Sequence, residues 1–277
     1  MTQPLAVSIA GATGWAGSAL ARGVASSADL TLVSGVSRSH SGTSLGEALA
    51  ADMESEVGRA LLDAPVYTTV EEALAARATD VLVEYTKPNL AKSNVLTALE
   101  HGAHVVVGTS GLTDEDYLEI HAAAKAANKG VLAAGNFALT VVLLMKFAET
   151  AARLIPHWEI VDYAHATKID APSGTVRELA SRLGKASHAQ LAVPIADTVG
   201  EKATRGATMG TAQVHSVRLP GFTLGTEVLF GLPDQRLSIR TDAGTSAEPY
   251  VDGALIAIRK VGTFTGLRRG LDSVLDL

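Results

Sequence analysis

The chain has 277 residues, of which 47% are hydrophobic and 19% charged, so it can bury a large core in one large or two modest domains. Its formal net charge is −6 and no cluster of Lys and Arg interrupts the acidic balance, which argues against a nucleic-acid partner and favours a small molecule. Cysteine is absent from the sequence, which excludes disulfides, thiolate nucleophiles and Cys-ligated metals, and we expect no metal site.

The N-terminal segment differs from a signal peptide, because no basic residue precedes Arg22 and glycines interrupt the apolar run. The most apolar stretch, residues 130–145, contains Asn136 and is shorter than the ~18 residues that suggest a membrane span. We therefore expect a cytoplasmic protein with no membrane partner.

Up to about residue 136, short β-branched runs alternate with alanine-rich helical stretches. The apolar runs predict strands buried on both faces of a sheet and comprise residues 6–10, 30–36, 80–86, 104–109 and 130–135. Helical spacing occupies residues 71–78, 89–102 and 113–130, and the last two helices are expected to end on Gly102 and Gly130. This alternation predicts an α/β domain with a Rossmann-like, doubly wound parallel sheet.

The glycine-rich loop after the first strand has the pattern Gly11-x-x-Gly14-x-x-Gly17 and leads into a helix. Glycines allow a tight turn and the close approach of a pyrophosphate, and the amides of the new helix receive its negative charge. Ala12 departs from the G-x-G-x-x-G spacing, and the alternative is a packing turn. The place of the loop after the first strand favours a dinucleotide site.

Polar residues also follow the later strands. Residues 37–41 read SRSHS, so Ser37 and Arg38 stand where a carboxylate would bind the ribose of NADH. Because Arg38 can pair with the extra phosphate of NADPH, the segment predicts that NADPH is preferred. The alternative is a solvated polar loop. Residues 85–88 and 108–111 end two further strands, either as ligand-binding loops or as simple turns. The lack of cysteine excludes a semialdehyde dehydrogenase mechanism, and the absence of any Tyr-x-x-x-Lys excludes a short-chain dehydrogenase mechanism.

After residue 150 the pattern changes to closely spaced strands with Gly and Pro turns. The strands are expected at residues 158–165, 210–220, 225–233 and 235–241, which predicts a second, α+β domain with a mainly antiparallel sheet. Residues 250–262 are helical again and are expected to pack on the first domain.

The segment DYAHATKIDAPSGT places His165 and Lys168 just ahead of a tight turn. Thr175 and Glu178 have the spacing of a capping box and predict a helix that begins at Thr175. The helix start, with its nearby hydroxyls, predicts a carboxylate pocket at Ser173, Gly174 and Thr175. A lone His or Lys in a loop is usually structural, whereas both beside an anion-binding helix start favour a functional site.

Together these segments resemble the dihydrodipicolinate reductase family. The resemblance is carried by KIDAPSGT, VVVGTSGL, VLVEYTKP, AGNFAL and the ending GLRRGLDSVLDL, and it extends nearly end to end. It implies a dinucleotide-binding domain at residues 1–136, completed by 249–277, and a substrate-binding and tetramer-forming domain at 137–248. It also implies NAD(P)H-dependent reduction of a cyclic imine dicarboxylate, 4-hydroxy-tetrahydrodipicolinate, in lysine (diaminopimelate) biosynthesis.

Carried over residue by residue, the resemblance assigns Lys168 and His165 to the catalytic loop and Ser173, Gly174 and Thr175 to a substrate carboxylate. We expect NADPH as the cofactor, with NADH as a second donor, bound by Gly11, Thr13, Gly14, Trp15, Ala16, Gly17, Ser37, Arg38, Tyr85, Thr86, Gly108, Thr109, Gly111, Asn136 and Phe137.

The chain departs from the family pattern at Ala164. The family usually reads Glu-x-His-His-x-x-Lys where this chain reads DYAHATK, so the first histidine of the pair, generally given the general-acid role, is replaced. Lys168 is therefore the expected proton donor. Trp15 also stands where many members carry a basic residue. Two alternatives remain open: a paralogue that reduces another imine or enone, and an NADPH-sensing module without turnover.

Overall fold

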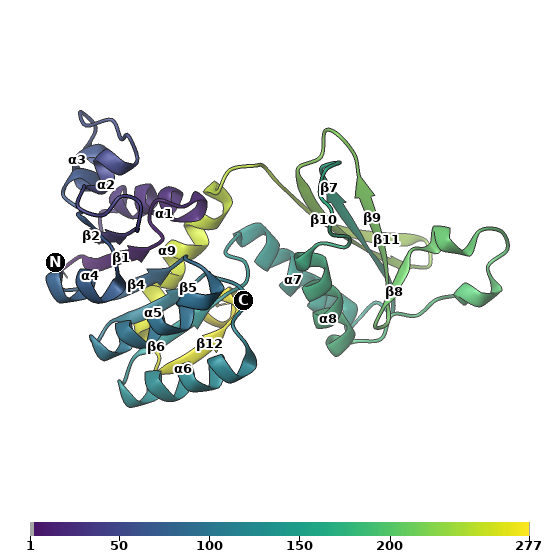
Figure 1. Cartoon of the computed structure of the whole chain (residues 1–277). Helices are drawn as coiled ribbons and strands as arrows, with labels where there is room; N and C mark the ends of the chain where they lie inside the picture. Colours follow the sequence, from purple (N-terminus) through teal and green to yellow (C-terminus); the bar gives the residue numbers. More distant parts are fainter. Residues whose placement is uncertain (1–2, 277) are drawn as a thin grey trace. The chain divides into compact units, whose positions relative to one another are not determined.

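The computed structural model describes residues 3–276; residues 1, 2 and 277, at the ends of the expected domain ranges, lie outside the described part. The chain divides into two compact units, which are described separately (Figure 1). The first unit comprises the described residues up to Leu139 together with Ala247–Asp276, and the second comprises Thr140–Ser246.

The first unit is built on a seven-stranded parallel sheet with the order β12-β6-β5-β4-β1-β2-β3. Its strands are β1 Leu5–Ala10, β2 Leu30–Val36, β3 Val66–Tyr67, β4 Val81–Glu84, β5 His104–Val107, β6 Gly130–Ala133 and β12 Gly266–Arg269. Its α-helices are α1 Trp15–Ala25, α2 Leu45–Ala48, α3 Glu56–Leu62, α4 Val70–Ala76, α5 Pro88–Glu100, α6 Asp114–Ala126 and α9 Val251–Lys260. Its 3-10 helices are η3 Glu248–Tyr250, η4 Val261–Thr263 and η5 Leu271–Val274.

Helices cover both faces of this sheet, which explains why its central strands are continuous apolar runs. Helices α1 and α9 pack together, whereas α4, α5 and α6 pack in succession as a second layer (Figure 1). Every residue of β4 and β6 is buried. The predicted doubly wound parallel sheet is confirmed.

Two local predictions for this unit differ from the structure. Strands β4, β5 and β6 end at Glu84, Val107 and Ala133, so the polar residues after them lie in turns. Helix α6 ends at Ala126, before Gly130, which instead begins β6. A Cβ at Gly130 would lie 2.0 Å from the carbonyl oxygen of Val261, so glycine is required there by close packing rather than as a helix stop.

The second unit contains a five-stranded sheet with the order β11-β10-β7-β9-β8. Its strands are β7 His157–Ala164, β8 Ala207–Met209, β9 Ala212–Arg218, β10 Leu224–Leu232 and β11 Gln235–Ala243. Its helices are α7 Leu139–Ala152, which starts at the unit boundary, α8 Gly174–Ala186, η1 Ile195–Asp197 and η2 Lys202–Arg205. All neighbouring strands are antiparallel except β7 and β9, which confirms the predicted, mainly antiparallel sheet.

Strand β7 alternates strictly between a buried and a partly exposed face. Trp158, Ile160 and Ala164 occupy the buried face, on the side of the sheet where α8 packs. Asp162 shares that face, so a carboxylate is buried at the end of the strand that leads into the predicted catalytic loop.

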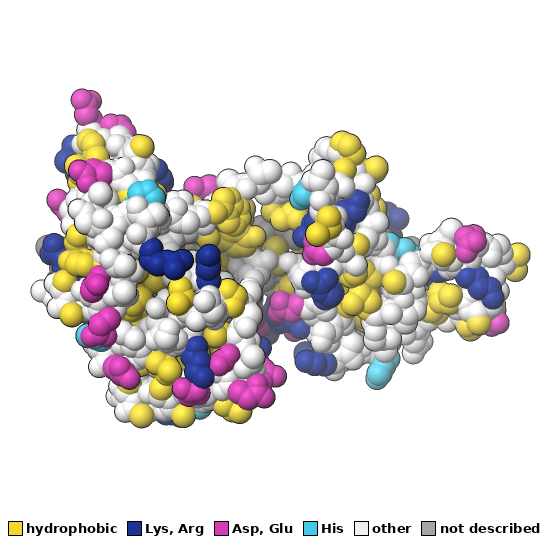
Figure 2. Space-filling model, in the orientation of Figure 1, with side chains coloured by type: hydrophobic (Ala, Val, Ile, Leu, Met, Phe, Trp, Pro, Cys, Tyr) yellow, Lys and Arg dark blue, Asp and Glu magenta, His cyan; other side chains and the backbone are white. Residues whose placement is uncertain are grey.

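No helix within residues 3–276 is both long and apolar enough to cross a membrane. Within the same range, no group of three or more His, Asp or Glu side chains is arranged to hold a metal ion. On the face drawn in Figure 2, basic side chains are scattered among acidic ones.

Candidate functional site

The parallel sheet of the first unit reverses its strand order between β1 and β4, and ligands of open α/β sheets bind at such a point, outside the carboxyl ends of the strands. The chain runs from β1 outward to β2 and β3 and then returns to β4 on the other side of β1. Ala10 and Glu84 are partners in the register, so the loops that follow both strands begin at the same edge.

The glycine loop lies at this edge and is closely packed. Gly11 has a φ of +81°, and a Cβ there would lie 2.2 Å from the carbonyl oxygen of Tyr85; a Cβ at Gly17 would lie 2.1 Å from the carbonyl oxygen of Gly11. Gly14 is the N-cap of α1, where no side chain caps the helix and the first turn contains no acidic residue. The N–H groups of that turn are therefore available to an anion such as a pyrophosphate.

A chain of hydroxyls connects the glycine loop to the end of β2. The Oγ1 of Thr13 lies 2.7 Å from the Oγ of Ser37, and Ser39 Oγ lies 2.9 Å from Nδ1 of His40. Arg38 is exposed beside them and forms no ion pair with any residue in the range 3–276. The sequence-predicted Thr13, Ser37 and Arg38 thus lie around one polar edge, suited to a phosphate group.

A cavity of about 250 Å³ follows the carboxyl ends of β4, β5 and β6; it is lined by Trp15, Ala16, Tyr85, Gly108, Gly135, Asn136, Phe137 and Tyr250. A Cβ added at Gly108 would lie only 2.2 Å from Cε1 of Tyr85, so the tyrosine ring packs directly against this glycine. Trp15 meets Tyr250 edge to face, with ring centroids 5.6 Å apart. Tyr250 was not predicted as a site residue, because it lies far from the loops in sequence and carries no motif.

Burial raises the pKa of Tyr85 well above its ordinary value of 10.0, and the nearby Tyr250 adds to the effect. Tyr85 therefore keeps its proton at neutral pH. Its hydroxyl has no hydrogen-bond partner within the described part of the chain, which leaves it available as a donor to a ligand in the cavity.

Three predicted cofactor residues support the loops rather than line this cavity. Thr86 donates to the Glu84 carboxylate through its hydroxyl and through its amide, at 3.1 Å, and Thr109 Oγ1 lies 3.5 Å from the Glu84 carbonyl oxygen. Gly111, with a φ of +99°, lies against Pro88. Glu84 is fully buried and was missed by the sequence analysis, although an acidic residue ending an apolar run is a usable signal.

The predicted catalytic loop of the second unit joins β7 to α8 and contains His165 and Lys168. The Lys168 amide donates to the His165 carbonyl at 3.1 Å, which forms a turn, and His165 Nδ1 lies 2.8 Å from Thr167 Oγ1. Nζ of Lys168 lies 2.7 Å from Oδ1 of Asp170. The hydrogen bond from Lys168 lowers the pKa of the Asp170 carboxyl below its ordinary value.

The prediction that α8 begins at Thr175 with a capping box was wrong. The helix begins at Gly174, and Ser173 is its N-cap, accepting a hydrogen bond from the Val176 amide at 3.3 Å. The Ser173 amide donates to the buried Asp162 at 2.8 Å, which fixes this residue as the turning point. The first turn has no acidic residue, so the free N–H groups at Gly174 and Thr175 retain the predicted capacity for a carboxylate.

The buried Asp162 and the partly buried Arg218 form an ion pair at this loop, with 2.7 Å between Oδ2 and Nη2. Neither residue was predicted as part of the site. The alternation of β7 could have revealed Asp162 as a core-facing acid, whereas its partner lies 56 positions later in the chain. Ala164, the position of the family histidine, is fully buried on the same face.

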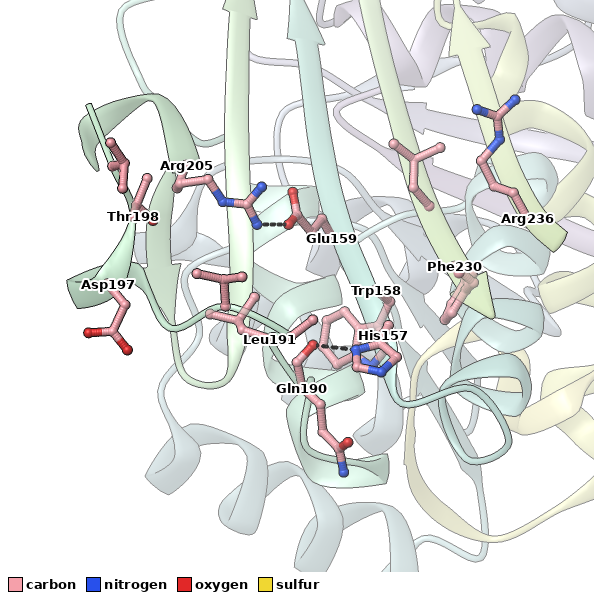
Figure 3. A pocket seen from close by; sticks show the side chains of 15 residues that line it. His157, Trp158, Glu159, Gln190, Leu191, Asp197, Thr198, Arg205, Phe230 and Arg236 are labelled. Carbon is pink, nitrogen blue, oxygen red and sulfur yellow. Dashed lines mark hydrogen bonds and ion pairs between the residues drawn. The ribbon is translucent and has the colours of Figure 1, made fainter. Parts of the chain in front are cut away.

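A larger cavity of about 710 Å³ in the second unit lies elsewhere, near the start of β7 (Figure 3). His157 and Trp158 line it from the strand, and Arg205 reaches Glu159 across one side. No residue predicted from the sequence lines this cavity.

Two family models together match nearly the whole chain. Residues 5–137 match the family model described as "Dihydrodipicolinate reductase, N-terminus", and residues 140–275 match "Dihydrodipicolinate reductase, C-terminus". The chain is 34% identical over 279 residues to the 4-hydroxy-tetrahydrodipicolinate reductase of Moorella thermoacetica, covering all of both chains. It is 39% identical over 214 residues to the enzyme of that name from Halalkalibacterium halodurans, covering 77% of this chain and 81% of the relative.

Among solved structures, the dipicolinate-bound dihydrodipicolinate reductase from Paenisporosarcina sp. TG-14 superposes with a TM-score of 0.86 at 27% identity, covering 99% of this chain and all of the other. An amine dehydrogenase from Mycobacterium smegmatis shares the fold, with a TM-score of 0.65 at 15% identity, covering all of this chain and 97% of the other. The matches to both family models span nearly the full sequence, and the chain belongs to the dihydrodipicolinate reductase family.

Proposed function

We propose that this chain is an NAD(P)H-dependent reductase of 4-hydroxy-tetrahydrodipicolinate in lysine (diaminopimelate) biosynthesis. The observation that carries the proposal is the loop from His165 to Thr175, which presents an ammonium group and a free helix start close together in sequence, within a chain related along its length to reductases of that name. The reaction needs a hydride donor, a carboxylate-binding group and a proton donor.

The first unit binds the dinucleotide. When bound, the reduced nicotinamide supplies a hydride. The uncapped start of α1 receives the pyrophosphate, and Gly11 and Gly17 permit its close approach. Trp15, Tyr85 and Asn136 line the cavity beyond it.

NADPH is the preferred donor in this proposal. Arg38 is unpaired within the described residues and stands beside the hydroxyls of Thr13 and Ser37, with no carboxylate at the end of β2 to repel a phosphate. A guanidinium pairs with phosphate through charge-assisted hydrogen bonds, whereas the ribose hydroxyl of NADH offers it no charge.

The second unit binds the substrate and supplies the proton. The α8 start at Gly174 and Thr175 holds a carboxylate of the cyclic imine, and Lys168 holds a proton at Nζ for the product nitrogen. Asp170 forms an ion pair with that ammonium group. Because Ala164 has no ionisable group, the family's usual donor is absent and Lys168 or the exposed His165 takes its place.

We further propose that the protein is cytoplasmic and forms a homo-oligomer, a tetramer as the family resemblance implies. The partly exposed face of β7, with the cavity in Figure 3 and the exposed Val193 and Val199 nearby, offers apolar surface that a second copy would cover. Sedimentation velocity measures the assembly directly: a sharp tetramer boundary is expected, and a monomer at all concentrations contradicts this part.

Cofactor consumption distinguishes this proposal from its alternatives. Purified protein is supplied with NADPH and freshly generated 4-hydroxy-tetrahydrodipicolinate, and the fall in NADPH absorbance is followed. Steady turnover is expected. Turnover only on another imine or enone favours a paralogue, and tight NADPH binding with no turnover on any such substrate favours a sensor.

A further inference from the structure

The carboxylate of Asp162 is buried at the end of β7 and is surrounded by hydrogen-bond donors. Its Oδ2 accepts from the Ser173 amide at 2.8 Å, from Arg218 Nη2 at 2.7 Å and from Ser216 Oγ at 3.4 Å. Ser216 and Arg218 come from β9, which runs parallel to β7 with Asp162 opposite Ser216. One carboxylate thus joins the neighbouring strand to the first residue of the α8 cap.

Arg218 extends these contacts into the loop. The same Nη2 that pairs with Asp162 also donates to the Asp170 carbonyl at 2.8 Å, and Nη1 donates to the Asp162 carbonyl at 3.3 Å. The side chain of Asp170 is the ion-pair partner of Lys168. The guanidinium therefore holds the backbone of the residue that holds the ammonium, without touching Lys168 itself.

We infer that Arg218, paired with Asp162, is a positioning residue: it fixes the loop so that Lys168 and the α8 start are presented to the same substrate molecule. The inference rests on the proposed function for its chemistry and on the contacts above for its geometry. The segment from Asp170 to Ser173 is tied to this one ion pair at both ends, through a carbonyl at one and an amide at the other. One guanidinium nitrogen, Nη2, reaches both oxygens, while Nη1 adds the contact to the Asp162 carbonyl, a second point of attachment that a lysine ammonium lacks.

A purely stabilising role would be a weak reason for such a pair. Taking two charges out of water costs free energy that their attraction repays only with good geometry, so buried ion pairs often add little net stability. The hydrogen bonds of this pair are directed at the loop backbone on either side of the turn. Removing one partner leaves a charge unpaired and is expected to lower stability as well, so a positioning role is recognised by an effect on dipicolinate affinity and turnover in variants that are folded.

The test compares Arg218→Lys, Arg218→Met and Asp162→Asn with Arg259→Met as the matched control. Arg259 also forms an Arg–Asp pair, but in the first unit, with Asp29 just before the start of β2. Three readouts are taken on the full chain: hydrogen exchange of the amides in residues 165–175, binding of dipicolinate and of NADPH by calorimetry, and kcat and KM for the proposed substrate.

In Arg218→Lys and Arg218→Met we expect faster hydrogen exchange across residues 165–175. Dipicolinate affinity should fall about ten-fold, as for one lost charge-assisted hydrogen bond. NADPH affinity should not change. Asp162→Asn keeps an acceptor for the Ser173 amide and is expected to lie between them and wild type, and Arg259→Met to match wild type. If Arg218→Met does not fold, Arg218→Lys and Asp162→Asn decide whether the inference holds.

Folded Arg218→Lys with wild-type loop exchange, dipicolinate affinity and kcat would overturn the inference. Equal weakening of dipicolinate and NADPH would also overturn it, because that pattern indicates general destabilisation. If wild type itself neither binds dipicolinate nor turns over, the proposed function fails, and the exchange measurement still decides whether Arg218 fixes the loop.

Discussion

Thr13 in the glycine loop and Ser37 at the end of β2 lie hydroxyl to hydroxyl, 2.7 Å apart, and this contact joins the pyrophosphate loop to the strand end that carries Arg38. This hydrogen bond holds the two loops close together; in the proposed complex the glycine loop receives the pyrophosphate of NADPH and Arg38 the phosphate on its adenosine ribose.

Replacing Arg38 by Ala is expected to remove the preference for NADPH over NADH. A charge-assisted hydrogen bond to phosphate contributes about 1.5–3 kcal/mol, which corresponds to roughly ten-fold or more in affinity. Calorimetric titration of both cofactors into wild type and Arg38→Ala gives the two ratios. Equal affinities for the two cofactors in wild type would show that the loop does not select the phosphate.

Trp15 is expected to report cofactor binding. It is 60% exposed and lines the first-unit cavity, whereas the other tryptophan, Trp158, is only 3% exposed and lies in the second unit. NADPH should quench most of the Trp15 fluorescence, and Trp15→Phe should lose that signal while Trp158→Phe keeps it. A quench that survives Trp15→Phe would place the dinucleotide away from this cavity.

Tyr85 is expected to contribute to the loss of stability at alkaline pH. Its folded-state pKa is raised above the ordinary 10.0 by burial, so the stability linked to its proton is fully present below that pH. Above it the unfolded chain ionises first, and stability is lost as the pH rises. In urea titrations across this range Tyr85→Phe should show a shallower decline than wild type, with Trp15→Phe, which changes the same cavity without an ionisable group, as control. Identical slopes for Tyr85→Phe and wild type would contradict the account.

Ser173 and Thr175 are expected to separate stability from binding. Ser173→Ala removes the cap of α8 and should lower the free energy of unfolding by about 1 kcal/mol. Thr175→Val leaves the cap intact and should change stability little, yet weaken dipicolinate binding. Chemical denaturation measures the stability of both variants, and calorimetry measures their affinity for dipicolinate. A larger loss of stability in Thr175→Val than in Ser173→Ala would show that Thr175 caps the helix, as the sequence suggested.

The sequence predicted the parallel sheet well because strands buried on both faces must be apolar at every position, and that pattern is local. The start of α8 was misplaced because Ser173 and Thr175 are both competent caps, and the choice depends on Asp162, a tertiary contact. Strand β12 was missed because its sequence, GLRR, is half basic; Arg268 and Arg269 lie over the rings of Phe264 and Tyr117 at the sheet edge. Arg218 had no motif, since its partners become neighbours only when β9 pairs with β7.

The measurement that tests the central claim most directly is the steady-state rate of 4-hydroxy-tetrahydrodipicolinate reduction by wild type, Lys168→Ala and His165→Asn with saturating NADPH. General acid catalysis by one positioned side chain typically contributes about 10²–10⁴-fold, so Lys168→Ala should lower kcat by that order while NADPH affinity is unchanged, and His165→Asn should have the smaller effect. Full wild-type turnover that survived Lys168→Ala would contradict the account, because the proton would then come from another group.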